Sequence, residues 1–145
     1  MAVSCEFCRI VRGDAAAHVV LEDERLLAFL DHRPLFPGHT LLVPRAHHET
    51  LADLPAPLVA PLFEQARLLA LAVERAFGAD GSFVAINNRV SQSVPHLHVH
   101  IVPRRFKDGL RGFFWPRARY PTEAAALEAR RAVTAAIEAL RSGSV

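Results

Sequence analysis

The sequence predicts an α+β fold with a five-stranded antiparallel sheet, two main helices and a C-terminal extension. Three observations predict it: short apolar segments separated by turns, one long stretch with helical periodicity, and strand connections mostly too short for parallel crossovers. The 145 residues suit one compact fold, and the 51% apolar share can form a core. We expect residues 1–106 to form the main domain, with residues 107–145 as an extension that packs on it.

The first third of the chain supplies three of the predicted strands. Residues 5–11 are expected to form a short helix or an ordered arm. Residues 19–21 and 26–31 have the composition of short strands and are joined by an acidic turn. After a loop punctuated by proline and glycine, residues 39–43 form a third strand, which Pro44 closes.

The middle of the chain supplies a helix and two more strands. Apolar residues recur at steps of three or four over residues 58–77, which predicts an amphipathic helix that Gly78 ends. Two prolines belong in or before its first turn, where proline is tolerated. The fourth and fifth strands are predicted over residues 83–87 and 97–102.

The extension is predicted to be a loop followed by a helix. Thr122 can N-cap this helix, which runs to about Leu140. We expect it to be a packing or dimer-contact helix without chemistry, with an inner face formed by Val133, Ile137 and Leu140.

Composition excludes several classes of function. The formal net charge of +2 is too small to indicate a nucleic-acid partner. The N-terminal residues lack the apolar run of a secretory signal, and the apolar segments fall short of the roughly 20 residues of a membrane span. We therefore expect a cytoplasmic protein, in which Cys5 and Cys8 are thiols or metal ligands and not a disulfide.

The most informative segment runs from Pro95 to Pro103. Side chains alternate faces along a strand, so His96, His98 and His100 share one face, while Leu97, Val99 and Ile101 pack on the other. Neutral imidazole is both a nucleophile and a proton carrier near neutral pH. It also binds metal, but a catalytic metal site would usually need a carboxylate or a further histidine nearby, and the next acid downstream is Asp108.

The residues before these three histidines (the histidine stripe) favour phosphate chemistry. Ser91, Gln92 and Ser93 supply hydroxyl, amide and backbone donors in the loop that enters the strand. Such donors can hold phosphate oxygens while a neutral histidine attacks phosphorus. Asn87 and Asn88, at the end of the preceding strand, can add further donors.

The sequence resembles the histidine triad (HIT) superfamily. Residues 96–102 match its signature of three histidines alternating with apolar residues. Further motifs follow in family order between residues 5 and 104: Phe7-Cys8-Arg9-Ile10, Ala28-Phe29-Leu30-Asp31, Pro37-Gly38-His39-Thr40, Val43-Pro44-Arg45-Ala46-His47 and Gln92-Ser93-Val94.

This resemblance implies a HIT-like fold, a homodimer, and a small purine nucleotide as substrate. It implies that His98 attacks the α-phosphorus to form a nucleotidyl-histidine intermediate, which water then hydrolyses. It further implies that His100 holds the phosphate and that Gln92 and Ser93 position the phosphate and leaving group. Asp31 would accept hydrogen bonds from the ribose, and His39 and Asn87 match positions that line the site.

One position departs from the family pattern. Ser91 stands where the family commonly has glycine, before Gln92, in a loop that is shortened. Glycine permits a close approach of the backbone to phosphate. Ser91 therefore bears on whether this loop makes the same phosphate contacts as in other members of the family.

The spacing of Cys5 and Cys8 suits half of a tetrahedral zinc site. Similar bacterial proteins complete such a site with the histidine after Pro-Arg/Lys-x and the first histidine of the triad. The resemblance thus implies a structural Zn²⁺ held by Cys5, Cys8, His47 and His96, with His48 as the alternative ligand.

The leading hypothesis is a hydrolase that cleaves dinucleoside polyphosphates or nucleoside phosphoramidates at the α-phosphate. A nucleotidyltransferase or phosphorylase would use the same intermediate with phosphate or a sugar phosphate in place of water. The family's transferase branch has glutamine at the third histidine, so His100 favours the hydrolases. Two further hypotheses are a nucleotide-binding protein with little turnover and a metal-dependent hydrolase that uses the histidine stripe.

Overall fold

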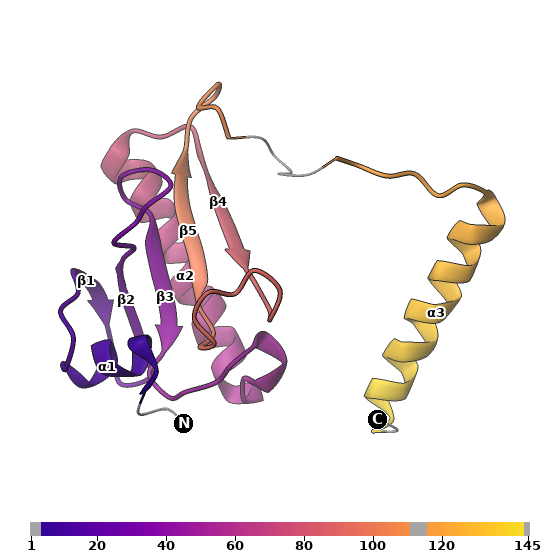
Figure 1. The fold of residues 1–145 in the computed structure, drawn as a ribbon, viewed down its shortest axis with the longest axis horizontal. Coiled ribbons are helices and arrows are strands. Elements are labelled where there is room, and N and C mark those ends of the chain that lie inside the picture. The colour runs from indigo at the N-terminus through magenta and orange to yellow at the C-terminus, as the bar shows by residue number, and fades with distance from the viewer. Residues whose placement is uncertain (1–3, 111–115, 144–145) are drawn as a thin grey trace. The chain divides into compact units, whose positions relative to one another are not determined.

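The computed structural model describes residues 4–110 and 116–143 (Figure 1). The chain divides into two compact units, residues 1–108 and 109–145. The elements of the first unit are α1 (Glu6–Arg12), β1 (Val19–Glu22), β2 (Leu26–Leu30), β3 (Thr40–Pro44), the short 3-10 helix η2 (Leu51–Asp53), α2 (Ala56–Phe77), β4 (Gly81–Ile86) and β5 (Val99–Arg104).

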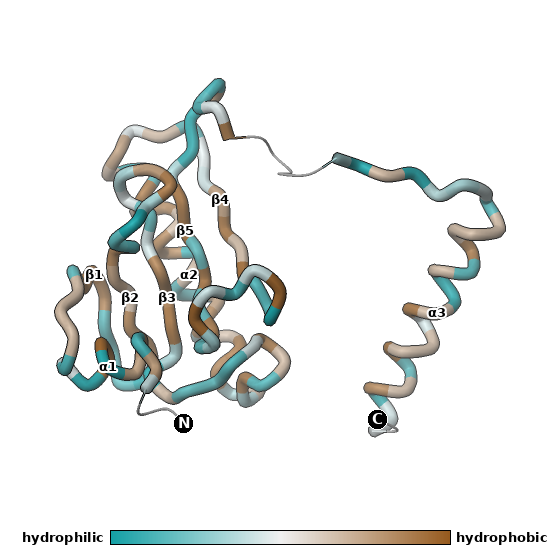
Figure 2. Tube along the Cα trace, in the orientation of Figure 1, coloured by the Kyte–Doolittle hydropathy of each residue, from teal (hydrophilic) through white to brown (hydrophobic). Residues whose placement is uncertain are grey.

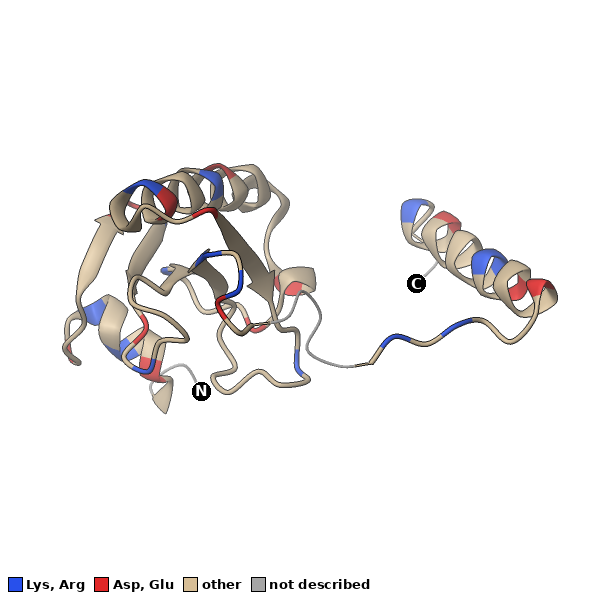
Figure 3. Cartoon of the chain, turned by 90° about the horizontal axis from the view of Figure 1, so that it is seen from above, with Lys and Arg blue, Asp and Glu red and all other residues tan. Residues whose placement is uncertain are grey.

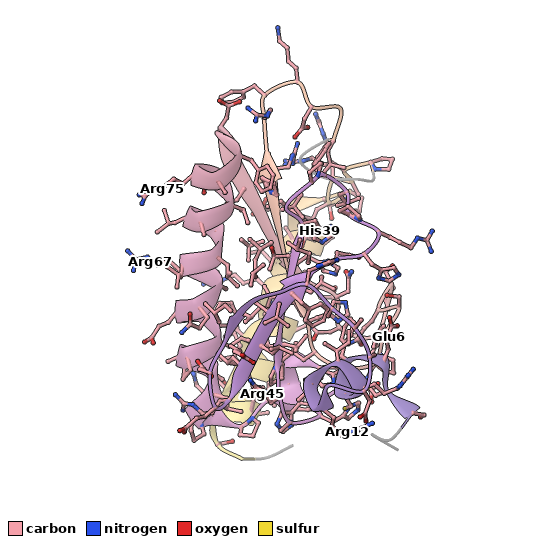
Figure 4. All side chains as sticks on the ribbon, turned by 90° about the vertical axis from the view of Figure 1, so that its left-hand side faces the viewer. Glu6, Arg12, His39, Arg45, Arg67 and Arg75 are labelled. Atoms are coloured by element: carbon pink, nitrogen blue, oxygen red, sulfur yellow. The ribbon has the colours of Figure 1, made fainter. Side chains whose placement is uncertain are left out.

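The predicted five-stranded antiparallel sheet is confirmed. Its strand order is β1-β2-β3-β5-β4, and every neighbouring pair is antiparallel. The long α2 contacts β3, β4 and β5 and lies along one face of the sheet, as the view from above shows (Figure 3). Arg67 and Arg75 extend from α2 away from the sheet (Figure 4). The side of α2 that faces away from the sheet carries these arginines together with exposed apolar residues such as Leu68 and Leu71, which are 51% and 52% exposed.

The core consists of two clusters, one on each face of the sheet. Side chains that alternate along β2 contribute to both clusters. Leu26 and Ala28 belong to the cluster under α2, and Leu27 and Phe29 belong to the cluster under α1. The apolar stretches that supply these clusters stand out along β2 and β3 in Figure 2. The short α1 therefore completes the core on the face opposite α2.

The fifth strand begins later than predicted. Regular pairing starts at Val99, because the Leu97 N–H donates to the carbonyl of His48, in the segment after β3, at 2.7 Å. The strand also extends to Arg104, beyond the predicted end. Leu97 and Val99 are nevertheless both fully buried in the cluster under α2. The predicted alternation of faces thus continues through residues that precede the regular strand.

By length and composition α2 could cross a membrane, because an 18-residue window reaches a mean hydropathy of 1.4. The prediction that the apolar segments are far too short was wrong on this point. Leu62, Ala66, Leu69 and Val73 of this helix are buried in the core cluster, and 22% of that window is buried inside the protein.

The C-terminal unit contains α3 (Glu123–Arg141). Thr122 is its N-cap, as predicted, because its hydroxyl oxygen accepts from the Ala125 N–H at 3.1 Å. The predicted inner face is exposed, with Val133, Ile137 and Leu140 at 61%, 43% and 62%. The packing of this extension on the main domain stays a prediction.

Gly38 offers a test of the packing between the β3 entry and the end of α2. It has φ +96°, and a Cβ atom there would overlap the Phe77 ring. We expect Gly38→Ala to lower the free energy of unfolding by about 2–3 kcal/mol, because the left-handed backbone is strained and the Phe77 ring, which is 41% exposed, must rotate away. Gly78→Ala is the matched control, because its φ is +55° and the added Cβ meets open space. Urea titration should show a loss of only about 1 kcal/mol there, and equal losses would contradict the role of the Phe77 contact.

Candidate active site and metal centre

The three histidines lie on the face of the sheet that α1 covers. His96 is fully buried and His98 is 4% exposed, and His100 pairs with Leu41 of β3 and with Ala85 of β4 in the sheet register. The neighbouring rings of His98 and His100 are 4.8 Å apart between centroids. The strand therefore presents two imidazoles close enough to act on one small group.

A cavity of about 870 Å³ lies beside these rings. Its apolar wall includes Phe7 and Ile10 from α1 together with Phe29 and Leu41 from the sheet. Its polar lining includes Asp31, Ser93, His98 and His100. Cavities of this size with a few convergent polar groups are typical of small-molecule sites.

The tautomer of His98 is fixed by its own backbone neighbourhood. Its Nδ1 lies 2.7 Å from the carbonyl oxygen of His96. A carbonyl can only accept, so Nδ1 carries the proton and Nε2 keeps its lone pair. Phe7 from α1 meets the His98 ring edge-on, with centroids 5.1 Å apart, and restricts its rotation. This arrangement prepares Nε2 of His98 to act as a nucleophile.

His100 is held neutral beside His98. Burial, with smaller contributions from His98 and His39, lowers the pKa of His100 to about 4. Its Nδ1 lies 3.0 Å from Nε2 of His39. His39 is 3% exposed and is not among the described residues that line the cavity, so it lies behind His100, and its predicted contact with a ligand stays a prediction.

Asp31 lies at the cavity, next to the end of β2. Its Oδ1 accepts from the Arg33 N–H at 2.9 Å, which fixes the carboxylate in a local turn. Its Oδ2 is 3.7 Å from Nε2 of His39, too far for a good hydrogen bond. This carboxylate therefore retains capacity to accept hydrogen bonds from a ligand.

The loop before the histidines differs from its predicted arrangement at Gln92. The side chain is engaged within the protein: Oε1 accepts from the Arg89 N–H at 2.9 Å, and Nε2 donates to the Glu49 carbonyl at 2.7 Å. Of the predicted loop residues, Ser93 lines the cavity, whereas Gln92 and Asn87 are not among the lining residues that the structure describes. Ligand contacts by Gln92 and Asn87 stay predictions.

Backbone strain marks the same loop. Ser91, at the position where glycine is usual, has φ +63°, and Arg89 has φ +67°. Left-handed backbone costs a residue with a side chain roughly 1–2 kcal/mol, so other contacts must hold the loop. One of them was not predicted as an anchor: Oδ1 of Asn88 accepts from the Leu51 N–H at 2.8 Å.

The second cluster brings together Cys5, Cys8, His47 and His96, with one ligand atom from each, all within 4.8 Å of one another. His48 is not part of this cluster. Nδ1 of His96 is 3.5 Å from the sulfur of both cysteines, and Nδ1 of His47 is 3.3 Å from that of Cys8. A tetrahedral zinc ion with Zn–S near 2.3 Å and Zn–N near 2.0–2.1 Å requires S···N separations of roughly 3.5 Å. The donor set therefore fits such an ion.

A hydrogen bond orients His96 as a ligand. Its Nε2 donates to the Pro44 carbonyl at 2.8 Å, which leaves the Nδ1 lone pair directed at the cysteines. Burial lowers the pKa of His96 to about 4, and burial together with Cys5 raises the pKa of the Cys8 thiol. Metal binding favours the neutral imidazole and the thiolate, so the ion would release the thiol protons.

The HIT domain model matches residues 12–107, two thirds of the chain. The protein belongs to the HIT family.

The sequence analysis named the histidines at the cavity and those beside the two cysteines. It missed Phe7 as a contact of His98, because nothing in the local pattern marks a phenylalanine between two cysteines.

Three relatives place the chain within the HIT family. Adenylylsulfatase HINT3 of Arabidopsis thaliana is 36% identical over 73% of this chain, and the chain spans 55% of the length of that protein. Adenosine 5′-monophosphoramidase hnt1 of Schizosaccharomyces pombe is 36% identical over 79% of this chain and 84% of its own. The crystal structure of a Zn-bound histidine triad family protein from Mycobacterium smegmatis is 41% identical, with a TM-score of 0.72 over 81% of this chain and 86% of that one.

Proposed function

We propose that the protein is a nucleotide hydrolase that cleaves small purine nucleotide conjugates at the α-phosphate through a nucleotidyl-histidine intermediate on His98. One observation carries this proposal: the His98 Nδ1–H donates to the His96 carbonyl at 2.7 Å, which frees Nε2 beside the cavity. Asp31, Ser93 and His100 line the same cavity and supply polar partners for a nucleotide.

In the first step, Nε2 of His98 forms a bond to the α-phosphorus. The bond from phosphorus to the leaving group breaks, and the leaving group departs with the electron pair and takes up a proton from the solvent. The His98 ring gains positive charge as the bond forms, and the His96 carbonyl stabilises that charge through the Nδ1–H bond. His100 donates a hydrogen bond to a phosphate oxygen, and Ser93 contributes a hydroxyl at the cavity wall.

In the second step, water attacks the phosphorus and the bond to Nε2 breaks. One proton is released, and the products are a nucleoside monophosphate and free His98. Asp31 accepts hydrogen bonds from the ribose hydroxyls and so fixes the nucleotide in both steps. The names of the two enzymatic relatives support adenosine conjugates, a phosphoramidate or an adenylyl sulfate, as substrates.

We further propose that the Cys5, Cys8, His47 and His96 cluster holds a structural Zn²⁺. Its donor set and spacing fit the ion, and a relative of similar fold is Zn-bound. The bound ion would supply a rigid link, because Cys5 is the N-cap residue of α1, Cys8 lies within that helix, and His96 lies just before β5.

The proposal includes a homodimer in the cytoplasm, with no nucleic-acid or membrane partner. The edge position of β4 supports the dimer, because β4 ends the sheet and, among the described strands, pairs with β5 alone. Val84 on this strand is 43% exposed, and Phe63 of α2 is equally exposed. A second copy of the chain would cover these apolar side chains.

The His98→Ala variant tests the mechanism. We expect the release of AMP from adenosine 5′-phosphoramidate and from a diadenosine polyphosphate, measured by chromatography, to fall by a factor of about 10³ or more. Circular dichroism should show a retained fold. His48→Ala is the control, because this histidine is outside both the cavity lining and the metal cluster. Turnover by His98→Ala at the wild-type rate would refute the mechanism.

Zinc content and stability test the metal site together. We expect about one zinc per chain by elemental analysis and less in Cys8→Ser. Chelation should lower the Tm by roughly 5–10 °C, because an ion that binds the folded chain stabilises it. Turnover should decline less than it does in His98→Ala. Immediate loss of turnover on chelation at an unchanged Tm would instead support a catalytic metal.

A further inference from the structure

We propose that His39 is a positioning residue that locks His100 in the tautomer with its proton on Nε2, the atom that donates to the substrate phosphate. The consequence for catalysis rests on the proposed function, but the tautomer itself does not. The inference starts from His39 itself, which is buried behind His100 and is not among the residues that line the cavity.

A backbone amide determines where His39 carries its proton. The Leu35 N–H lies 3.1 Å from Nδ1 of His39, across a turn that also pairs the His39 N–H with the Phe36 carbonyl. An amide nitrogen can only donate, so Nδ1 of His39 must present its lone pair. The neutral ring then carries its single proton on Nε2.

The proton on His39 in turn determines the tautomer of His100. Nε2 of His39 is 3.0 Å from Nδ1 of His100, so His39 donates and His100 accepts at this contact. Burial lowers the pKa of both rings, to about 4 for His100, so both are neutral near pH 7. With Nδ1 occupied as an acceptor, the one proton of neutral His100 sits on Nε2.

The direction of this hydrogen-bond chain matters for an anionic substrate. His100 lines the cavity, and Nε2–H can donate to a phosphate oxygen. The opposite tautomer would present a lone pair to the same oxygen and repel it. His39 therefore acts through His100. It holds His100 in the Nε2–H tautomer before the substrate binds, so no binding free energy is needed to select that tautomer.

A metal ion is the competing explanation for this cluster, because ligand atoms of Asp31, His39 and His100 lie within 4.8 Å of one another. An ion would need the lone pair of His39 Nε2, which moves the proton to Nδ1. That proton would then face the Leu35 N–H across 3.1 Å, donor against donor. The amide of Leu35 thus favours the hydrogen-bond chain.

Nitrogen-15 NMR of the imidazoles in the whole protein tests the tautomer directly. In the wild type we expect Nδ1 of His100 to resonate as an unprotonated nitrogen and Nε2 as a protonated one. His39→Leu removes the donor and should give a mixture of tautomers. His39→Gln retains an N–H donor and should restore the single tautomer. A wild-type His100 protonated on Nδ1 would overturn the proposal without any variant.

Kinetics with adenosine 5′-phosphoramidate supply the second readout. We expect His39→Leu to lose a factor of about 10–100 in kcat with a smaller change in KM, and His39→Gln to recover most of it. A changed tautomer with unchanged kcat would overturn the positioning role. Joint shifts of the His39 and His100 resonances on adding Zn²⁺ to the holoprotein would favour the metal instead. Failure of the proposed function would appear separately, as turnover by His98→Ala.

Discussion

The candidate site depends on the hydrogen bonds of one residue, His96. Its Nε2–H donates to the Pro44 carbonyl, so Nδ1 faces the two cysteines of the N-terminal arm. Its carbonyl accepts the Nδ1–H of His98, so Nε2 of the proposed nucleophile is free. Because a single residue makes both sets of contacts, the end of β3, the start of α1 and the reactive nitrogen are fixed relative to one another.

The rest of the fold compensates for the free-energy cost of burying these histidines. Buried imidazoles destabilise a protein unless their nitrogens are paired, and here the proton-bearing nitrogens of His96, His98 and His39 each have a partner. On the other face of the same segment, Leu97 and Val99 are fully buried under α2. The burial of these apolar side chains under α2 offsets the free energy that burying the imidazoles on the opposite face costs. On that opposite face, α1 covers His98 through Phe7.

The features that the sequence predicts well are those with a local physical cause. A period of two places His96, His98 and His100 opposite the apolar residues whatever the tertiary structure, and helical periodicity likewise locates α2. The directions of Gln92 and His39 could not be predicted, because they depend on the Glu49 carbonyl and the Leu35 N–H, which only folding brings near. The late start of β5 has the same origin, a contact between Leu97 and His48.

Trapping the intermediate tests the central claim most directly. The protein would be mixed with adenosine 5′-phosphoramidate, quenched in base within milliseconds, because phosphohistidine bonds survive base better than acid, and digested for peptide mapping by mass spectrometry. The account predicts an adenylyl group on the peptide that contains His98, assigned to that residue by fragmentation, whose amount rises and then decays as AMP accumulates. An adenylyl group on His100 or another residue, or steady release of AMP with no adduct at any time, would contradict it.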